Sequence, residues 1–175
     1  MDELVLVDEN DGVVGYAEKL SAHQDGGKLH RAFSVFIHNS AGQLLLQRRA
    51  QGKYHFPGVW SNSCCSHPLR GEDLVEAVRV RLEFEMGIVT DLTEVDAFVY
   101  RAEDASSGLV EHEFDHVFLG KHDGDPAPNA DEADGWRWCE VSGLAADIEQ
   151  NPSRYSPWLC IALRRLIERG ILKAK

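Results

Sequence analysis

One amphipathic helix set between strand-like segments limits this chain to a mixed fold. Over residues 72–86 the apolar positions recur every four residues, which places them in one stripe along a helix. The stripe consists of Leu74, Val78 and Leu82. Acidic residues open the segment, where the positive end of the helix dipole favours them, and Gly87 follows as a helix stop. A chain with this helix in its middle needs an apolar surface for the helix to cover.

Strand-like segments on both sides of the helix supply that surface. They are short runs of β-branched and aromatic residues bounded by turn residues. The expected strands cover residues 4–7, 13–18, 33–37, 43–47, 95–101, 109–119 and 136–141. Two more helices are expected, one after Ser142 and one from Pro157 to Gly170, with Ser156 as its N-cap. We predict one α+β domain over residues 1–175.

Three segments are expected to be loops, namely residues 21–29, 51–70 and 122–134. The last is rich in proline and aspartate and is predicted to be a solvated excursion. The segment 51–70 is long, and long loops in compact domains are usually functional or disordered. Because it carries Phe56, Trp60 and two cysteines, we expect it to be functional.

The charge of the chain excludes several classes of partner. With 18 basic and 29 acidic residues the net charge is −11, which argues against binding to nucleic acid or to an anionic membrane. The N-terminal sequence lacks a signal-peptide pattern, and no apolar run approaches the ~18 residues of a membrane span. We therefore expect a cytoplasmic protein with reduced cysteines. Such a protein can still bind a phosphorylated molecule where Lys, Arg and bound cations gather.

The sequence Glu111-His112-Glu113 is a candidate metal-binding motif. In a strand, alternate side chains share a face, so the two glutamates point one way and the histidine the other. Two carboxylates on one face repel each other unless a cation or proton lies between them. His23, His30 and His67 are candidate partners, and imidazole with carboxylate suits a borderline divalent cation. The alternative is a solvated strand face with unrelated surface histidines.

Two further groups of residues carry possible chemistry. The candidate anion-binding residues are Lys19, Arg48, Arg49, Lys53 and Arg81. Arg81 and Glu85 are four apart on the expected helix, so they form either a simple surface ion pair or a Mg²⁺ and phosphate site. In the segment 63–68, a thiol near His67 is open to several roles: nucleophile, acid, metal ligand or buried small residue.

Five segments together resemble the type I isopentenyl-diphosphate isomerases, a branch of the Nudix fold. They are residues 29–34, 60–68, 100–102, 111–113 and 155–158, and the similarity extends from about Leu4 to Trp158. Two departures concern loop shape. Ser66 stands where glycine is usual, and the loop reads Tyr54-His55-Phe56-Pro57 where a tryptophan commonly precedes the proline. The resemblance implies a Nudix-like mixed β-sheet core flanked by helices.

The resemblance also implies the reaction and the residues that perform it. It implies interconversion of isopentenyl and dimethylallyl diphosphate by protonation and deprotonation of the alkene. The implied catalytic residues are Cys65 and Glu113, with Tyr100 beside the carboxylate. The implied ligands of one divalent cation, Mn²⁺, Mg²⁺ or Zn²⁺, are His23, His30, His67, Glu111 and Glu113. Glu85 would hold the Mg²⁺ that arrives with the substrate.

The remaining implied contacts are with the two ends of a small diphosphate substrate. The phosphate-binding positions would be Lys19, Arg49, Lys53 and Arg81, and Trp158 would face the hydrocarbon end. No redox cofactor is needed for this chemistry. We expect a monomer or a small homo-oligomer, with no nucleic acid or membrane partner.

Two other classes of protein are alternatives to such an isomerase. A Nudix diphosphate hydrolase needs several carboxylates in the segment 71–88, but only Glu85, Gly87 and the aliphatic positions fit that motif. A binding module with a structural metal would favour four ligands rich in cysteine, which the histidine and glutamate candidates do not match.

Overall fold

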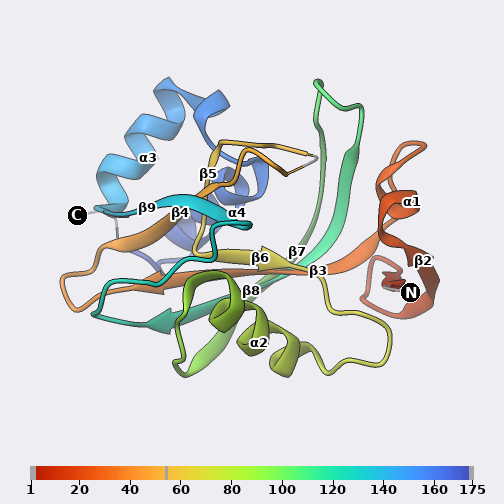
Figure 1. The fold of residues 1–175 in the computed structure, drawn as a ribbon, viewed down its shortest axis with the longest axis horizontal. Coiled ribbons are helices and arrows are strands. Elements are labelled where there is room, and N and C mark those ends of the chain that lie inside the picture. The colour runs from red at the N-terminus through yellow and green to blue at the C-terminus, as the bar shows by residue number, and fades with distance from the viewer. Residues whose placement is uncertain (1–2, 54, 174–175) are drawn as a thin grey trace.

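The computed structural model describes residues 3–53 and 55–173, and Figure 1 shows how its elements are arranged. The strands are β1 (Glu3–Val7), β2 (Val13–Glu18), β3 (His30–His38), β4 (Leu44–Arg49), β5 (Trp60–Ser61), β6 (Cys64–Ser66), β7 (Leu92–Glu103), β8 (Val110–Lys121) and β9 (Ala133–Cys139). The helices are α1 (Lys19–His23), α2 (Leu74–Met86), α3 (Val141–Gln150) and α4 (Pro157–Glu168), with the short 3-10 helix η1 (Pro152–Arg154) before α4. Within the described ranges, none of the helices is long and apolar enough to cross a membrane.

Strand β3 lies at the centre of a mixed sheet. It pairs in parallel with β8, and His30 lies opposite Glu113 in this pair. Along its other edge β3 meets β1 at His30, β6 from Phe33 to Val35, and β4 at His38. Strand β7 pairs antiparallel with β8, and β9 pairs antiparallel with β4. The ends of β3 and β8 that carry His30 and Glu113 are therefore brought together by the sheet itself.

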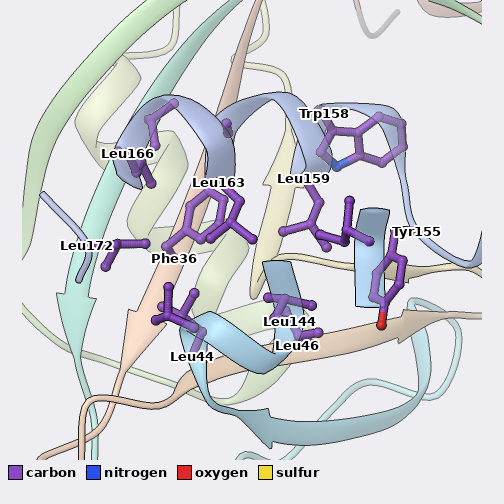
Figure 2. Close-up of a cluster of buried hydrophobic side chains, with 14 of the residues drawn as sticks. Phe36, Leu44, Leu46, Leu144, Tyr155, Trp158, Leu159, Leu163, Leu166 and Leu172 are labelled. Carbon is purple, nitrogen blue, oxygen red and sulfur yellow. The ribbon is translucent and has the colours of Figure 1, made fainter. Parts of the chain in front are cut away.

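Helices cover both faces of this sheet. In Figure 1 α2 lies on one side of β3 and β8, and α3 and α4 lie on the other. Successive residues of β3 serve the two faces in turn: Phe33 and Val35 belong to the core under α2, while Phe36 belongs to the core under α4. Figure 2 shows the second core, where Leu159 and Leu163 of α4 pack above Phe36. A strand buried on both faces explains the continuous apolar run of β3.

The predicted elements are largely confirmed, with two differences in the expected loops. Helix α2 begins after Asp73, whose carboxylate accepts the Glu76 N–H, and ends at Gly87 in a left-handed conformation (φ 66°). The expected loop 21–29 instead begins inside α1, because the Glu18 carboxylate caps that helix by accepting two backbone N–H groups. The long segment 51–70 contains the short strands β5 and β6.

The core under α4 gives a direct test of the packing. Leu159 is fully buried, so Leu159→Ala should lower the free energy of unfolding by about 2–5 kcal/mol through lost burial and a residual cavity. Urea titration followed by circular dichroism measures this change. Val99→Ala, at an exposed position of β7, is the control and should change stability by less than about 0.5 kcal/mol. Equal effects of the two changes would contradict the packing of α4 on the sheet.

Candidate active site

Five side chains that lie far apart in the sequence meet at one end of the β3 and β8 pair. His23 ends α1, His30 begins β3, and His67 follows β6. The two carboxylates come from β8. One potential ligand atom from each of the five residues lies within 4.8 Å of all the others; we call His23, His30, His67, Glu111 and Glu113 the His/Glu cluster. The three histidines expected as partners of the glutamate pair are thus brought together with it.

The carboxylates of the cluster face the imidazole rings directly. The Nε2 atom of His23 lies 3.0 Å from Oε2 of Glu111, and the Nε2 atom of His67 lies 2.7 Å from Oε1 of Glu113. The Nε2 atom of His30 lies 3.6 Å from that same Glu113 oxygen. This His30 nitrogen is buried and has no hydrogen-bond partner among the described residues. A buried imidazole nitrogen without a hydrogen-bond partner is suited to bind a metal ion.

The outer nitrogens of two rings are fixed by the backbone. The Nδ1 atom of His23 lies 2.7 Å from the carbonyl oxygen of Lys19, and that of His30 lies 2.7 Å from the carbonyl oxygen of Lys28. Such contacts select the tautomer and leave Nε2 free to coordinate, as is usual for metal-ligating histidines. Burial and the neighbouring His30 hold the pKa of His67 well below its ordinary value, which keeps the ring neutral. This donor set can bind a borderline divalent cation.

Glu113 also belongs to a group that includes Tyr100 and Cys65. Tyr100 lies opposite Glu113 in the β7 and β8 pair and donates its hydroxyl to Oε2 at 2.5 Å. Burial opposes ionisation of Glu113, but the contacts with His30 and Tyr100 bring its pKa down to about 2. Burial raises the pKa of the Cys65 thiol to about 12. Near neutral pH the cavity therefore holds a protonated thiol and an ionised carboxylate.

The two adjacent cysteines point to opposite sides of β6. Cys64 is fully buried in the core under α2. Cys65 lines the same cavity as His67 and Glu113 and packs against the core under α4. This alternation is the expected result of extended backbone, in which residues two apart share a side.

Next to the His/Glu cluster, basic and acidic side chains form a second group: Lys19, Lys53, Arg81, Glu85 and Glu132. The Nη2 atom of Arg81 lies 2.6 Å from Glu85 and 3.4 Å from Glu132. Lys53 also pairs with Glu132. Because Glu85 is only 3% exposed, its pair with Arg81 is not a simple surface ion pair. Burial and the charge of Lys53 lower the pKa of Lys19.

This charged group borders an open cavity of about 400 Å³ between α2 and the start of the chain. Lys19, Lys53, Arg81 and Glu132 line both this cavity and the inner one, which is also lined by Cys65 and by three residues of the His/Glu cluster, His67, Glu111 and Glu113. Basic groups next to a buried carboxylate can hold a phosphorylated ligand together with Mg²⁺. Three of the four candidate phosphate-binding residues thus lie together.

The fourth candidate, Arg49, lies deeper. Its Nε and Nη2 atoms donate to the carbonyl oxygens of Phe56 and His55, at 3.0 and 3.1 Å. Its Nη1 atom lies 3.9 Å from the Cys65 sulfur, and its guanidinium carbon lies 5.2 Å from the ring centre of Trp158. Arg49 is therefore placed beside the thiol; it lines the inner cavity with the other three cations but does not line the open one.

The residues of the site that the sequence analysis does not identify include Gln47, which donates to Glu85 at 3.0 Å, and two titratable residues. Glu132 was assigned to a solvated loop, yet it contacts Lys53 and Arg81. His55 lies in the segment expected to be functional, and it contacts Glu111 although no role was assigned to it. Its neighbour Tyr54 lies outside the described residues. Both titratable side chains come from loops, where no periodicity reveals direction.

Comparisons with known proteins agree with this fold and site. The NUDIX domain family matches residues 28–159. A solved structure from Deinococcus radiodurans is similar in fold, with a TM-score of 0.77 and 24% identity over 94% of this chain and 98% of that one. The chain therefore has a Nudix fold.

Curated relatives define the family more closely. Isopentenyl-diphosphate Delta-isomerase 2 of Aromatoleum aromaticum is 52% identical over 95% of this chain and 87% of its own length. The isopentenyl-diphosphate Delta-isomerase of Halorhodospira halophila is 49% identical over 96% of this chain and 94% of its own length. The chain belongs to the isopentenyl-diphosphate Delta-isomerase family.

The His/Glu cluster predicts a clear effect on metal binding. Glu111→Gln or His67→Ala should weaken binding of a divalent cation about tenfold or more. Loss of a group that only hydrogen-bonds a metal ligand already lowers metal affinity by typically 10–100-fold. Metal content after dialysis, measured by mass spectrometry, gives the result. His112→Ala is the matched control, since His112 lies between the two glutamates in sequence but contacts the Gly27 carbonyl. Full occupancy in both cluster variants would contradict the assignment.

Proposed function

We propose that this chain interconverts isopentenyl diphosphate and dimethylallyl diphosphate. One observation carries the proposal beyond family membership: the protonated Cys65 thiol and the ionised Glu113 carboxylate line one cavity. Moving a double bond requires one group that gives a proton and another that takes one. Glu113 is buried and Cys65 is half-buried against the core under α4, which limits the water around a carbocation-like intermediate.

In the forward direction, Cys65 gives its proton to the terminal carbon of the alkene. The electron pair of the double bond forms the new C–H bond, and the neighbouring tertiary carbon becomes cationic. Glu113 then removes a proton from the carbon on the diphosphate side, and that electron pair forms the new double bond. Arg49, beside the sulfur, stabilises the thiolate left behind. Proton exchange with solvent restores both groups, and the reverse reaction exchanges their roles.

The substrate would lie across the two cavities. Its diphosphate would bind Lys19, Lys53 and Arg81, with Glu85 holding the accompanying Mg²⁺. Its hydrocarbon end would lie between Cys65 and Glu113, bounded by Trp158. A cation in the His/Glu cluster would supply positive charge that keeps Glu113 ionised and in place. Tyr100 would hold the orientation of the same carboxylate.

The hydrolase alternative is not favoured by the geometry of α2. Nudix hydrolysis relies on several carboxylates of this helix to hold cations and orient water. Here Glu85 is the one carboxylate of α2 that lines the inner cavity among the described residues, and Arg81 and Gln47 each donate to one of its oxygens. The expected cytoplasmic location and small oligomeric state are part of this proposal.

Proton NMR of isopentenyl diphosphate mixed with the protein and Mg²⁺ in D₂O tests the proposed reaction. Dimethylallyl diphosphate should form reversibly, and deuterium should enter the allylic positions because the acid exchanges with solvent. Release of inorganic phosphate without isomer formation would refute isomerisation in favour of hydrolysis.

The two cysteines provide a matched pair of variants. Cys65→Ala should lower turnover by roughly 10²–10⁴-fold, the usual contribution of an acid–base group, with metal content unchanged. Cys64→Ala should keep most of the turnover and lower the free energy of unfolding by about 1 kcal/mol, as for a small buried truncation. Steady-state kinetics and urea titration measure the two effects. An inactive Cys64→Ala variant with an active Cys65→Ala variant would reverse the assignment.

A further inference from the structure

We propose that His55 is a positioning residue for the metal cluster, which it serves by holding Oε1 of Glu111. The inference rests on the proposed metal site but concerns a residue outside the five-residue cluster. His55 belongs to a loop between β4 and β5, whereas the cluster residues lie in or directly beside strands and helices. It lines the same inner cavity as His67, Glu111 and Glu113.

The contact is made to the Glu111 oxygen that does not face His23. Oε2 of Glu111 faces His23, at 3.0 Å, whereas Oε1 receives the Nε2–H of His55 in a short contact. The rings of His55 and His23 lie 5.5 Å apart between centres. Glu111 is thus held from both sides by imidazoles, which fixes the plane of its carboxylate. His55 is 7% exposed, so solvent does not compete strongly for this contact.

The backbone around His55 is held by side chains from two other parts of the chain. Arg49 donates to the carbonyl oxygens of His55 and Phe56. The Phe56 N–H donates to Oδ2 of Asp104, at the tip of the β7 and β8 hairpin, at 3.1 Å. Phe56 adopts φ 46°, a left-handed conformation that a phenylalanine rarely takes unless its surroundings impose it. Three hydrogen bonds therefore fix a strained backbone just where His55 begins to point at the cluster.

These contacts define a specific function for His55. Groups that hydrogen-bond a metal-ligating carboxylate orient it and thereby increase the affinity for the ion. If His55 acts through Glu111, any side chain that can donate a hydrogen bond over the same reach should replace it. A glutamine amide can do so, whereas alanine and asparagine cannot. A residue that only fills space would not show this dependence on donor and reach.

The test measures binding of Mn²⁺ alone to the whole protein, read from the electron paramagnetic resonance signal of the free ion. His55→Ala should raise the Kd for Mn²⁺ about tenfold or more, within the range typical of lost outer partners. His55→Gln should stay within about threefold of the wild type by the same argument. Gln51→Ala, an exposed position of the same loop, is the matched control and should leave the Kd unchanged.

Additional variants distinguish a positioning role of His55 from other roles. His55→Asn replaces His55→Ala if circular dichroism shows that the alanine variant does not fold. In a Glu111→Ala background, the effect of His55→Ala should vanish, because the side chain that accepts the hydrogen bond is gone. An unchanged Kd in His55→Ala, or an equal loss in His55→Gln, would overturn the proposal; the second result would make His55 a direct ligand. A wild-type protein that bound no Mn²⁺ would refute the cluster and this inference together, whereas isomerisation in D₂O decides the proposed function separately.

Discussion

The site depends on the burial of like charges on one face of β8. Glu111, Glu113 and Asp115 alternate along the strand and point the same way, and their mutual repulsion is strong where water is excluded. Two features of the fold reduce this repulsion between carboxylates. Imidazoles surround the first two carboxylates. Burial and the charge of Glu113 raise the pKa of Asp115 well above its ordinary value, which disfavours a third negative charge, and this carboxyl accepts a hydrogen bond from Ser34.

Sequence periodicity predicted the directions of side chains better than their partners. The period of two in strands placed Glu111 and Glu113 on one face, and it separated Cys65 from Cys64. The period of helices predicted α2 and the pair formed by Arg81 and Glu85. These are local properties, fixed by backbone geometry within a few residues.

The missed features arise from contacts between distant segments. Helix α1 depends on a cap by Glu18, which a strand pattern conceals. Glu132 is carried to the cavity by a loop whose backbone is bonded to the end of α2, where the Ala127 and Asn129 N–H groups donate to the Met86 and Glu85 carbonyl oxygens. A polar loop sequence does not encode such docking. The same applies to the placement of Arg49, whose role depends on which carbonyl groups the folded loop presents.

The parallel pairing of β3 and β8 determines when the site can assemble during synthesis of the chain. Ser34 and Asp115, joined across that pair, lie 81 residues apart in sequence. During synthesis the chain emerges from its N-terminus, so the three histidines leave the ribosome well before either cluster glutamate. A nascent chain offers ions imidazoles and thiols but not yet the carboxylates that complete the donor set. Selection of the metal is therefore a property of the folded donor set, which cannot be complete until Glu113 has been synthesised.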